Sequence, residues 1–168
     1  MNHPIADYQL LNMPKQEGIK VISNNKRATF DYELLERFEA GLILMGTEIK
    51  AIRSHQANLQ RSYVQNRNGE LWLLEANISP YMHGNRENHE PTRARKLLLH
   101  RREINKIIDQ VAQKSLTVVP TKLYLKNGRA KVEIALARGK RKADKRSDLA
   151  KKDANRQVER ALREKYRY

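Results

Sequence analysis

The chain has 168 residues, with 34 Lys and Arg against 19 Asp and Glu, and a formal net charge of +15. It contains no Cys, which excludes a disulfide-stapled secreted module, a Cys-ligated zinc site and a cysteine nucleophile. The longest apolar run, residues 40–45, is far below the roughly 20 residues that cross a bilayer, so we expect a cytoplasmic protein without a membrane partner. Such a basic chain is expected to bind a polyanion.

The positive charge is distributed unevenly. Residues 138–168 hold 13 Lys and Arg against 5 Asp and Glu, a net of +8, whereas residues 1–137 hold 21 against 14, a net of +7. The segment 138–168 buries too little apolar surface to offset its backbone entropy, so we expect a basic tail that is disordered when free. Residues 1–18 show no clear period and contain two prolines, which indicates a flexible lead. Residues 19–137 then form the folded domain.

The first expected elements lie between residues 29 and 53. Several apolar residues from Thr29 to Leu44 are aromatic or branched and partly alternate with polar ones, which favours a strand. A helix competes over Tyr32–Ala40, because the apolar residues there also fit the helical period. In residues 46–53, GTEIKAIR, the two isoleucines fix no period, and the preceding Gly and Thr favour a strand.

Two β-hairpins follow from turn chemistry. Residues 62–78 and 116–137 each contain two β-prone runs separated by Asn-Gly, at 68–69 and 127–128. Asn-Gly tolerates the positive φ angles of a type I′ turn, so each pair predicts a tight turn between antiparallel strands. In the second hairpin, alternation places one apolar row on a single face, formed by Val132, Ile134 and Leu136.

Residues 101–114, between the hairpins, have the pattern of an amphipathic helix. Their apolar residues follow the i, i+3, i+4, i+7 rule, at Ile104, Ile107, Ile108 and Val111. One such helix with about six short strands is typical of a small antiparallel barrel. The expected fold class is therefore mainly β, an oligonucleotide-binding-fold-like barrel with peripheral helices, although periodicity alone leaves other small α+β barrels open.

The basic tail also contains a helical pattern. On a helix, residues 147–167 place an apolar stripe opposite a row of arginines, and Ser147 with Asp148 supplies an N-cap and a first-turn acid. An isolated helix of this length is marginal in water, so we expect coil in isolation and a helix on a phosphate surface; a solvated helix without a ligand is the alternative. The row consists of Arg156, Arg160, Arg163 and Arg167.

Catalytic and metal-binding motifs are weak. The best metal candidate, His83 with Glu87, His89 and Glu90, matches no standard ligand spacing. We find no phosphate-binding loop, nucleophile elbow or paired-carboxylate motif. We therefore expect no enzyme, no metal and no cofactor. Two alternatives stay open: a metal-dependent ribonuclease built on these residues, and a structural ribosomal protein.

Three long strings resemble one known family. Residues 24–53 contain EAG, GTE and the following Lys50 and Arg53; residues 76–104 contain RKLLLHRREI; residues 121–146 contain ALARGK and DKR. In this order they resemble the SsrA-binding protein family, also called small protein B. The resemblance implies an oligonucleotide-binding-fold barrel that binds the transfer-RNA-like domain of transfer-messenger RNA.

The resemblance further implies an adaptor of trans-translation. Such an adaptor would bring the aminoacylated RNA, with elongation factor Tu, to ribosomes stalled without a stop codon. Its tail, disordered when free, would form a helix in the empty messenger channel at the small-subunit decoding centre, so that translation resumes on the tag frame. We expect a monomer.

Candidate RNA-binding positions carry over from the matching strings. The first set is Asn25, Lys26, Arg27, Glu39 and Leu98; the second is Lys50, Arg53, Asn85, Arg86, Arg93 and Lys96. Glu39 could accept from a base or hold a neighbouring cation, and Leu98 could pack on an unstacked base. We expect Asn25 to be exposed and unpaired, so that its replacement by Ala weakens RNA binding without unfolding the protein.

Candidate ribosome contacts lie in the tail. The resemblance assigns them to Gly139, Lys140, Arg141, Asp144, Lys145 and Arg146, and the helical pattern adds Arg156, Arg160 and Arg163. Many family members have Tyr or His directly before DKR, where this chain has Ala143. One decoding-centre contact is therefore in doubt.

Overall fold

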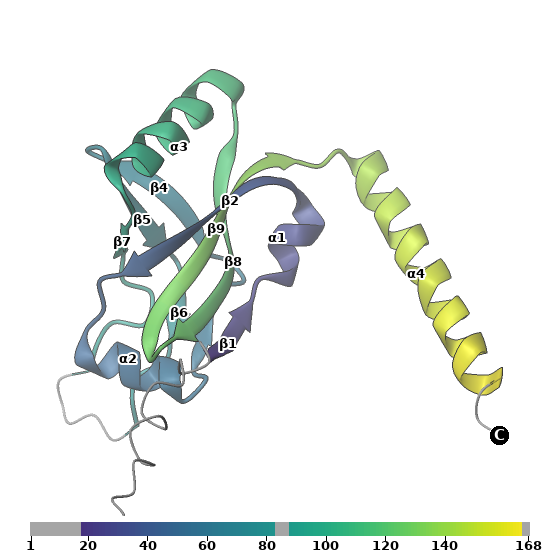
Figure 1. Cartoon of the computed structure of the whole chain (residues 1–168), viewed down its shortest axis with the longest axis horizontal. Helices are drawn as coiled ribbons and strands as arrows, with labels where there is room; N and C mark the ends of the chain where they lie inside the picture. Colours follow the sequence, from purple (N-terminus) through teal and green to yellow (C-terminus); the bar gives the residue numbers. More distant parts are fainter. Residues whose placement is uncertain (1–17, 83–87, 166–168) are drawn as a thin grey trace, which may run out of the picture.

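The computed structural model describes residues 18–82 and 88–165 (Figure 1). Almost all of the predicted lead, residues 1–18, lies outside the described part. Within it, the strands are β1 (Ile19–Asn24), β2 (Tyr32–Leu42), β3 (Ala57–Asn58), β4 (Tyr63–Arg67), β5 (Glu70–Leu74), β6 (Asn77–Ile78), β7 (Arg95–Leu98), β8 (Thr117–Lys126) and β9 (Arg129–Gly139). The helices are α1 (Lys26–Asp31), α2 (Gly46–Arg53), α3 (Arg101–Lys114) and α4 (Lys142–Lys165).

Six strands close into an antiparallel ring. The main sheet has the order β1-β8-β4-β5-β7-β2-β9, and an additional pairing between β8 and β9 joins its two sides. β1 lies outside the ring on β8, and β3 and β6 form a separate two-stranded sheet. The predicted fold class, mainly β with about six ring strands and peripheral helices, is confirmed.

Both predicted hairpins are present. β4 pairs with β5, and β8 pairs with β9, in antiparallel register. The turn residues have the positive φ angles expected of Asn-Gly, 52° and 76° at Asn68 and Gly69 and 51° and 76° at Asn127 and Gly128. These short turns bring the strands into register locally, which is why the sequence alone could locate them.

The apolar core fills the inside of the ring. Val132, Ile134 and Leu136 are buried there, as the alternation of β9 predicts. The predicted helix 101–114 is confirmed as α3, which packs Ile104 and Ile107 onto the same core. α3 covers one end of the ring in Figure 1.

The strand expected over residues 29–44 begins later than predicted. Residues 26–31 form α1, because the Asn25 side chain accepts a hydrogen bond from the backbone N–H of Ala28 and caps that short helix. From Tyr32 the chain is a strand rather than the competing helix, paired with β9 along its length.

The strand predicted for residues 46–53 is wrong, because this segment is the helix α2. The Met45 backbone N–H donates to Glu48 Oε2 at 2.7 Å, which satisfies a free donor at the helix start. The helix also turns Glu48 and Ile52 into the interior. The partners that hold the buried Glu48 carboxylate are arginines of residues 93–95, so no local pattern could reveal them.

The helix in the basic tail starts before the predicted cap at Ser147. α4 begins at Lys142, and the Arg141 backbone N–H donates to Asp144 Oδ2 at 3.1 Å, so Asp144 supplies the first-turn acid. Figure 1 shows α4 standing clear of the ring. The disorder predicted for the unbound tail stays a prediction.

Candidate nucleic-acid interface

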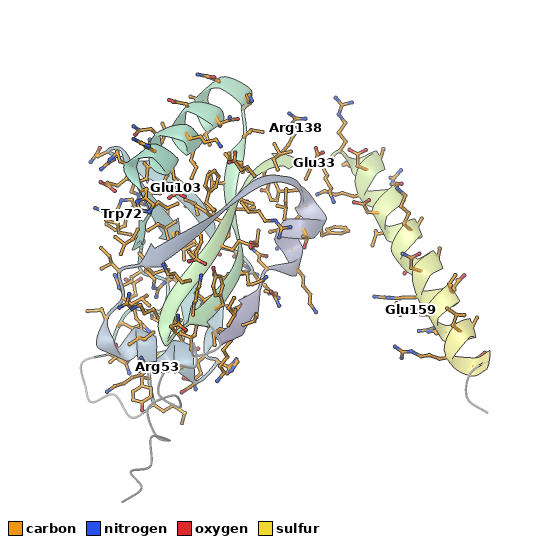
Figure 2. The ribbon with its side chains drawn as sticks, in the orientation of Figure 1. Glu33, Arg53, Trp72, Glu103, Arg138 and Glu159 are labelled. Atoms are coloured by element: carbon orange, nitrogen blue, oxygen red, sulfur yellow. The ribbon has the colours of Figure 1, made fainter. Side chains whose placement is uncertain are left out.

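A hollow of about 540 Å³ lies where β2, α2, β7 and the β8–β9 turn meet. We call it the Leu98 hollow, because Leu98 at its edge is an exposed large apolar side chain, with 51% of its surface accessible. Three cationic side chains line the hollow, and most of its other lining residues are apolar. The cations are Arg53, Arg129 and Lys131, and the floor includes Leu42, Leu44, Ile49 and Ala130. Figure 2 shows Arg53 at the α2 end of the molecule.

Glu39 lies in a second depression that adjoins this hollow. Leu98 and Lys131 line both. The structure therefore brings together three of the predicted RNA-binding residues, Glu39, Arg53 and Leu98. It adds Arg129 and Lys131, which follow the Asn-Gly turn on the outer face of β9. The alternation of β9 could have singled out both.

Leu98 is exposed because of the alternation in β7. Arg95 and Leu97 point inward and are buried, so Lys96 and Leu98 point outward. Gly41 of β2 lies opposite Leu98 in the ladder. A Cβ atom at Gly41 would lie 3.3 Å from Leu98 Cβ, so the glycine gives the leucine room to lie across the strand.

Glu39 is surrounded by positive charge. Its carboxylate accepts a hydrogen bond from the Tyr124 hydroxyl and lies 3.6 Å from Lys131 Nζ and 3.8 Å from Lys126 Nζ. The Tyr124 hydrogen bond, followed by the two lysine charges, holds the pKa of Glu39 below its ordinary value. Burial and the Glu39 carboxylate raise the pKa of the Tyr124 hydroxyl. Glu39 therefore stays ionised and orients Lys131 at the edge of the hollow.

The other RNA-binding candidates of the second set make different contacts. Lys50 is exposed on α2, with its Nζ 5.5 Å from the centre of the Tyr81 ring. Lys96 Nζ lies 3.5 Å from a Glu70 carboxylate oxygen. Asn85 and Arg86 lie outside the described residues, as do His83 and Glu87 of the metal candidate.

Arg93 is not a free surface cation. Its guanidinium forms a bidentate ion pair with Glu48, whose carboxylate is buried and also accepts from the fully buried Arg95 at 2.9 Å. Burial raises the pKa of Glu48, but the hydrogen bonds from Arg93 and the Met45 N–H and the charge of Arg95 outweigh it, so the net pKa is lowered. Arg93 therefore joins α2 to the chain before β7, and its contact with RNA stays a prediction.

Asn25 is buried, so the prediction that it is exposed and unpaired is wrong. Its side chain is 5% accessible, and its Nδ2 donates to the carbonyl oxygens of Leu59 at 3.1 Å and Pro120 at 2.9 Å. Together with its cap of Ala28, these bonds engage both the oxygen and the nitrogen of the amide. Its neighbours Lys26 and Arg27 are exposed, and Arg27 lines a separate hollow with Arg61 and Tyr63 that shares no residue with the Leu98 hollow.

His89 is held in the structure by both ring nitrogens. Its Nε2 lies 3.0 Å from the Ile78 carbonyl oxygen, which can only accept, so Nε2 carries the proton. Its Nδ1 lies 2.9 Å from the Thr47 hydroxyl oxygen. Within residues 18–82 and 88–165, no three His, Asp or Glu side chains lie close enough together to hold a metal ion.

The tail candidates fall into two groups. Gly139 ends β9, and Lys140, Arg141, Asp144, Lys145 and Arg146 follow at the base of α4. Arg156, Arg160 and Arg163 lie farther along α4, where the described side chains are exposed. Glu33 and Arg138, paired across β2 and β9, mark the point where the chain leaves the ring (Figure 2).

Comparison with known proteins identifies the family. The family described as SmpB protein matches residues 22–164. The chain belongs to this family. It is 56% identical over 153 residues to the SsrA-binding protein of Geobacillus thermodenitrificans, covering 91% of this chain and 98% of that protein. It is 53% identical over 148 residues to the SsrA-binding protein of Geobacter sulfurreducens, covering 88% and 97%.

The fold of this SmpB-family chain also matches a solved structure. That structure is described as "tmRNA-SmpB: a journey to the center of the bacterial ribosome". The match has a TM-score of 0.61 and 43% sequence identity, and covers 75% of this chain and 92% of the other. In the described part of the chain, no helix is long and apolar enough to cross a membrane.

Proposed function

We propose that this SmpB-family chain binds the transfer-RNA-like domain of transfer-messenger RNA and acts in trans-translation as an adaptor rather than an enzyme. Two findings support the proposal. The relatives carry the name SsrA-binding protein, and the solved structure with the same fold is described by tmRNA and the ribosome.

The observation that carries the proposal is the Leu98 hollow. An exposed leucine beside an apolar floor suits the face of an unstacked base, as RNA loops present it. Arg53, Arg129 and Lys131 around it suit the phosphates on either side of that base. Glu39 orients Lys131 and leaves a carboxylate that accepts from a base amino group.

The tail has the second role in this proposal. Its part beyond Asp148 is disordered in the free protein and forms a helix in the vacant messenger channel of the ribosome, with Arg156, Arg160 and Arg163 facing phosphates. The residues at its base, from Gly139 to Arg146, address the decoding centre. The protein acts as a cytoplasmic monomer and arrives with the aminoacylated RNA and elongation factor Tu.

Replacing Leu98 by Glu tests the RNA interface. A carboxylate in the hollow removes the apolar contact and repels phosphates, so we expect the affinity for the tRNA-like domain to fall by at least about tenfold, or 1.4 kcal/mol. Gel-shift titration with the transcribed domain measures this. Leu98 is exposed, so the melting temperature should stay close to that of the unmodified protein.

Leu35→Glu is the matched control. Leu35 is similarly exposed, at 44%, and lies on β2 outside the lining of the Leu98 hollow. It should retain the affinity of the unmodified protein. Equal losses in the two variants would show that added negative charge, and not the hollow, decides RNA binding.

A further inference from the structure

The base of the tail is tied to α1 by several contacts. The Lys145 Nζ donates to Asp31 Oδ1 at 2.7 Å and lies 5.8 Å from the centre of the Phe30 ring. The Lys140 backbone N–H donates to the Asp31 carbonyl oxygen at 2.9 Å, and its Nζ donates to the Thr29 carbonyl oxygen at 3.0 Å. Asp31 therefore holds the tail with both its carboxylate and its backbone.

The ties stop within the first two turns of α4. Lys140 Nζ also pairs with Asp148 Oδ2 at 2.7 Å, which joins the chain before α4 to its second turn. The described side chains from Leu149 onward are exposed. The tail therefore consists of a tied base, residues 138–148, and an untied remainder.

Asp31 also contacts a candidate RNA-binding residue. The Arg27 Nε lies 3.2 Å from Asp31 Oδ2, so the two carboxylate oxygens serve Arg27 and Lys145 separately. The Lys145 hydrogen bond, opposed by partial burial and supported by Arg27, holds the pKa of Asp31 below its ordinary value. The carboxylate is therefore charged at neutral pH.

We propose that Asp31 is a positioning residue for the tail: by holding Lys145 and Lys140, it fixes the direction in which α4 leaves the ring. The role of Asp31 in activity rests on the proposed function, because a tail with a fixed base enters a ribosomal groove from a defined direction. Asp31 itself belongs to neither set of proposed contacts, but its two partners, Arg27 and Lys145, each belong to one.

The direction of the tail can be measured by pulsed electron spin resonance on the full chain. The chain has no Cys, so two introduced cysteines carry the only spin labels. Gln113 on α3 and Ala150 on α4 are exposed and suit the labels. Ala150 lies just beyond the tied base, so the distance between the labels reports the base whether or not the rest of the tail is helical.

We expect one narrow distance distribution in the labelled protein and a clearly broader one after Asp31→Asn. Asp31→Glu keeps the carboxylate and should restore the narrow distribution. Asp153→Asn is the matched control, because the ion pair of Asp153 with Arg156 lies within α4 and its loss changes the net charge equally. It should leave the distribution narrow.

A broad distribution in the unmodified protein, or an unchanged one after Asp31→Asn, would overturn the proposal, as would equal broadening by Asp153→Asn. If Asp31→Asn fails to fold, Lys145→Gln removes the same tie from the tail and decides the question. Binding of the tRNA-like domain to the unlabelled protein tests the proposed function separately. Its failure leaves the distance result valid.

Discussion

The side chain of Asn25 joins three segments that are distant in the sequence. It caps α1 at Ala28 and donates to carbonyl oxygens of Leu59 and Pro120, all away from solvent. A buried amide with this many bonds is a structural group, because removing it breaks three buried hydrogen bonds at once. Any effect of Asn25 on RNA would therefore act largely through the placement of Lys26 and Arg27.

Replacing Asn25 by Ala should destabilise the fold. Loss of the amide removes the side-chain cap on Ala28 and the two buried hydrogen bonds to the Leu59 and Pro120 carbonyl oxygens, which lowers the free energy of unfolding by about 1–3 kcal/mol. Urea unfolding measures the change. Asn24→Ala, at the exposed neighbouring position, is the control and should be nearly neutral. A neutral Asn25→Ala would mean that the three bonds contribute little.

Among elements, the contact of α2 with β7 depends on the Glu48 ion cluster. One buried carboxylate holds Arg93 and Arg95, and Arg95 also donates to the carbonyl oxygens of Ala76 and Pro91. Breaking such a cluster leaves two guanidinium groups without a counter-charge. Because α2 forms one wall of the Leu98 hollow, the cluster also fixes the position of Arg53.

Glu48→Gln should lower the free energy of unfolding by about 3–5 kcal/mol at pH 7. The pKa of Glu48 is lowered by folding, so its stabilisation is complete above its unfolded pKa, near 4.3, and disappears as the pH falls through the lower folded value. The difference between the two proteins should therefore shrink in acid. Urea unfolding from pH 7 to pH 3 tests both statements.

Glu36→Gln is the control for this series. Glu36 forms an exposed ion pair with Lys106, so its loss should change stability much less. A Glu48→Gln protein that loses no more stability than Glu36→Gln would contradict the structural role of the cluster.

Elements that depend on neighbouring residues were predictable from the sequence, whereas an element that depends on a distant contact was not. The hairpins depend on Asn-Gly turns, and α3 depends on four apolar residues within two turns, so their signals lie within a few residues. The helix α2 depends on Arg95, which is 47 residues from Glu48. A short segment whose conformation depends on such a distant partner carries no sufficient pattern of its own.

For the whole molecule, the charge distribution predicted a separate tail but not its attachment. β9 continues to Gly139, and Arg138 and Gly139 pair with Glu33 and Tyr32. The first turns of α4 are then tied to α1. These ties involve single side chains on α1 and backbone atoms, which composition does not show. The candidate site was partly predictable because residues of three strings meet at the Leu98 hollow.

Two truncations should separate the ring from the tail. Ending the chain after Asp148 keeps β9 and the tied base, so the melting temperature and RNA affinity should match those of the full chain. Ending it after Ala137 removes the last β2–β9 pairs and the ties, so the melting temperature should fall. Both should abolish tagging in a reconstituted translation assay. Tagging by the longer truncation would contradict the role proposed for the tail.

The exposed length of α4 beyond Asp148 affects how preparations of this protein behave. Its backbone has no cover from the ring, and Arg156, Arg160 and Arg163 are cleavage points for trypsin-like proteases. Proteases in a cell extract would therefore cleave the chain at these arginines long before they digest the ring. If the proposed function holds, a cleaved sample would look folded and bind RNA normally while being inactive, so intact mass should be checked before any loss of activity is assigned to a substitution.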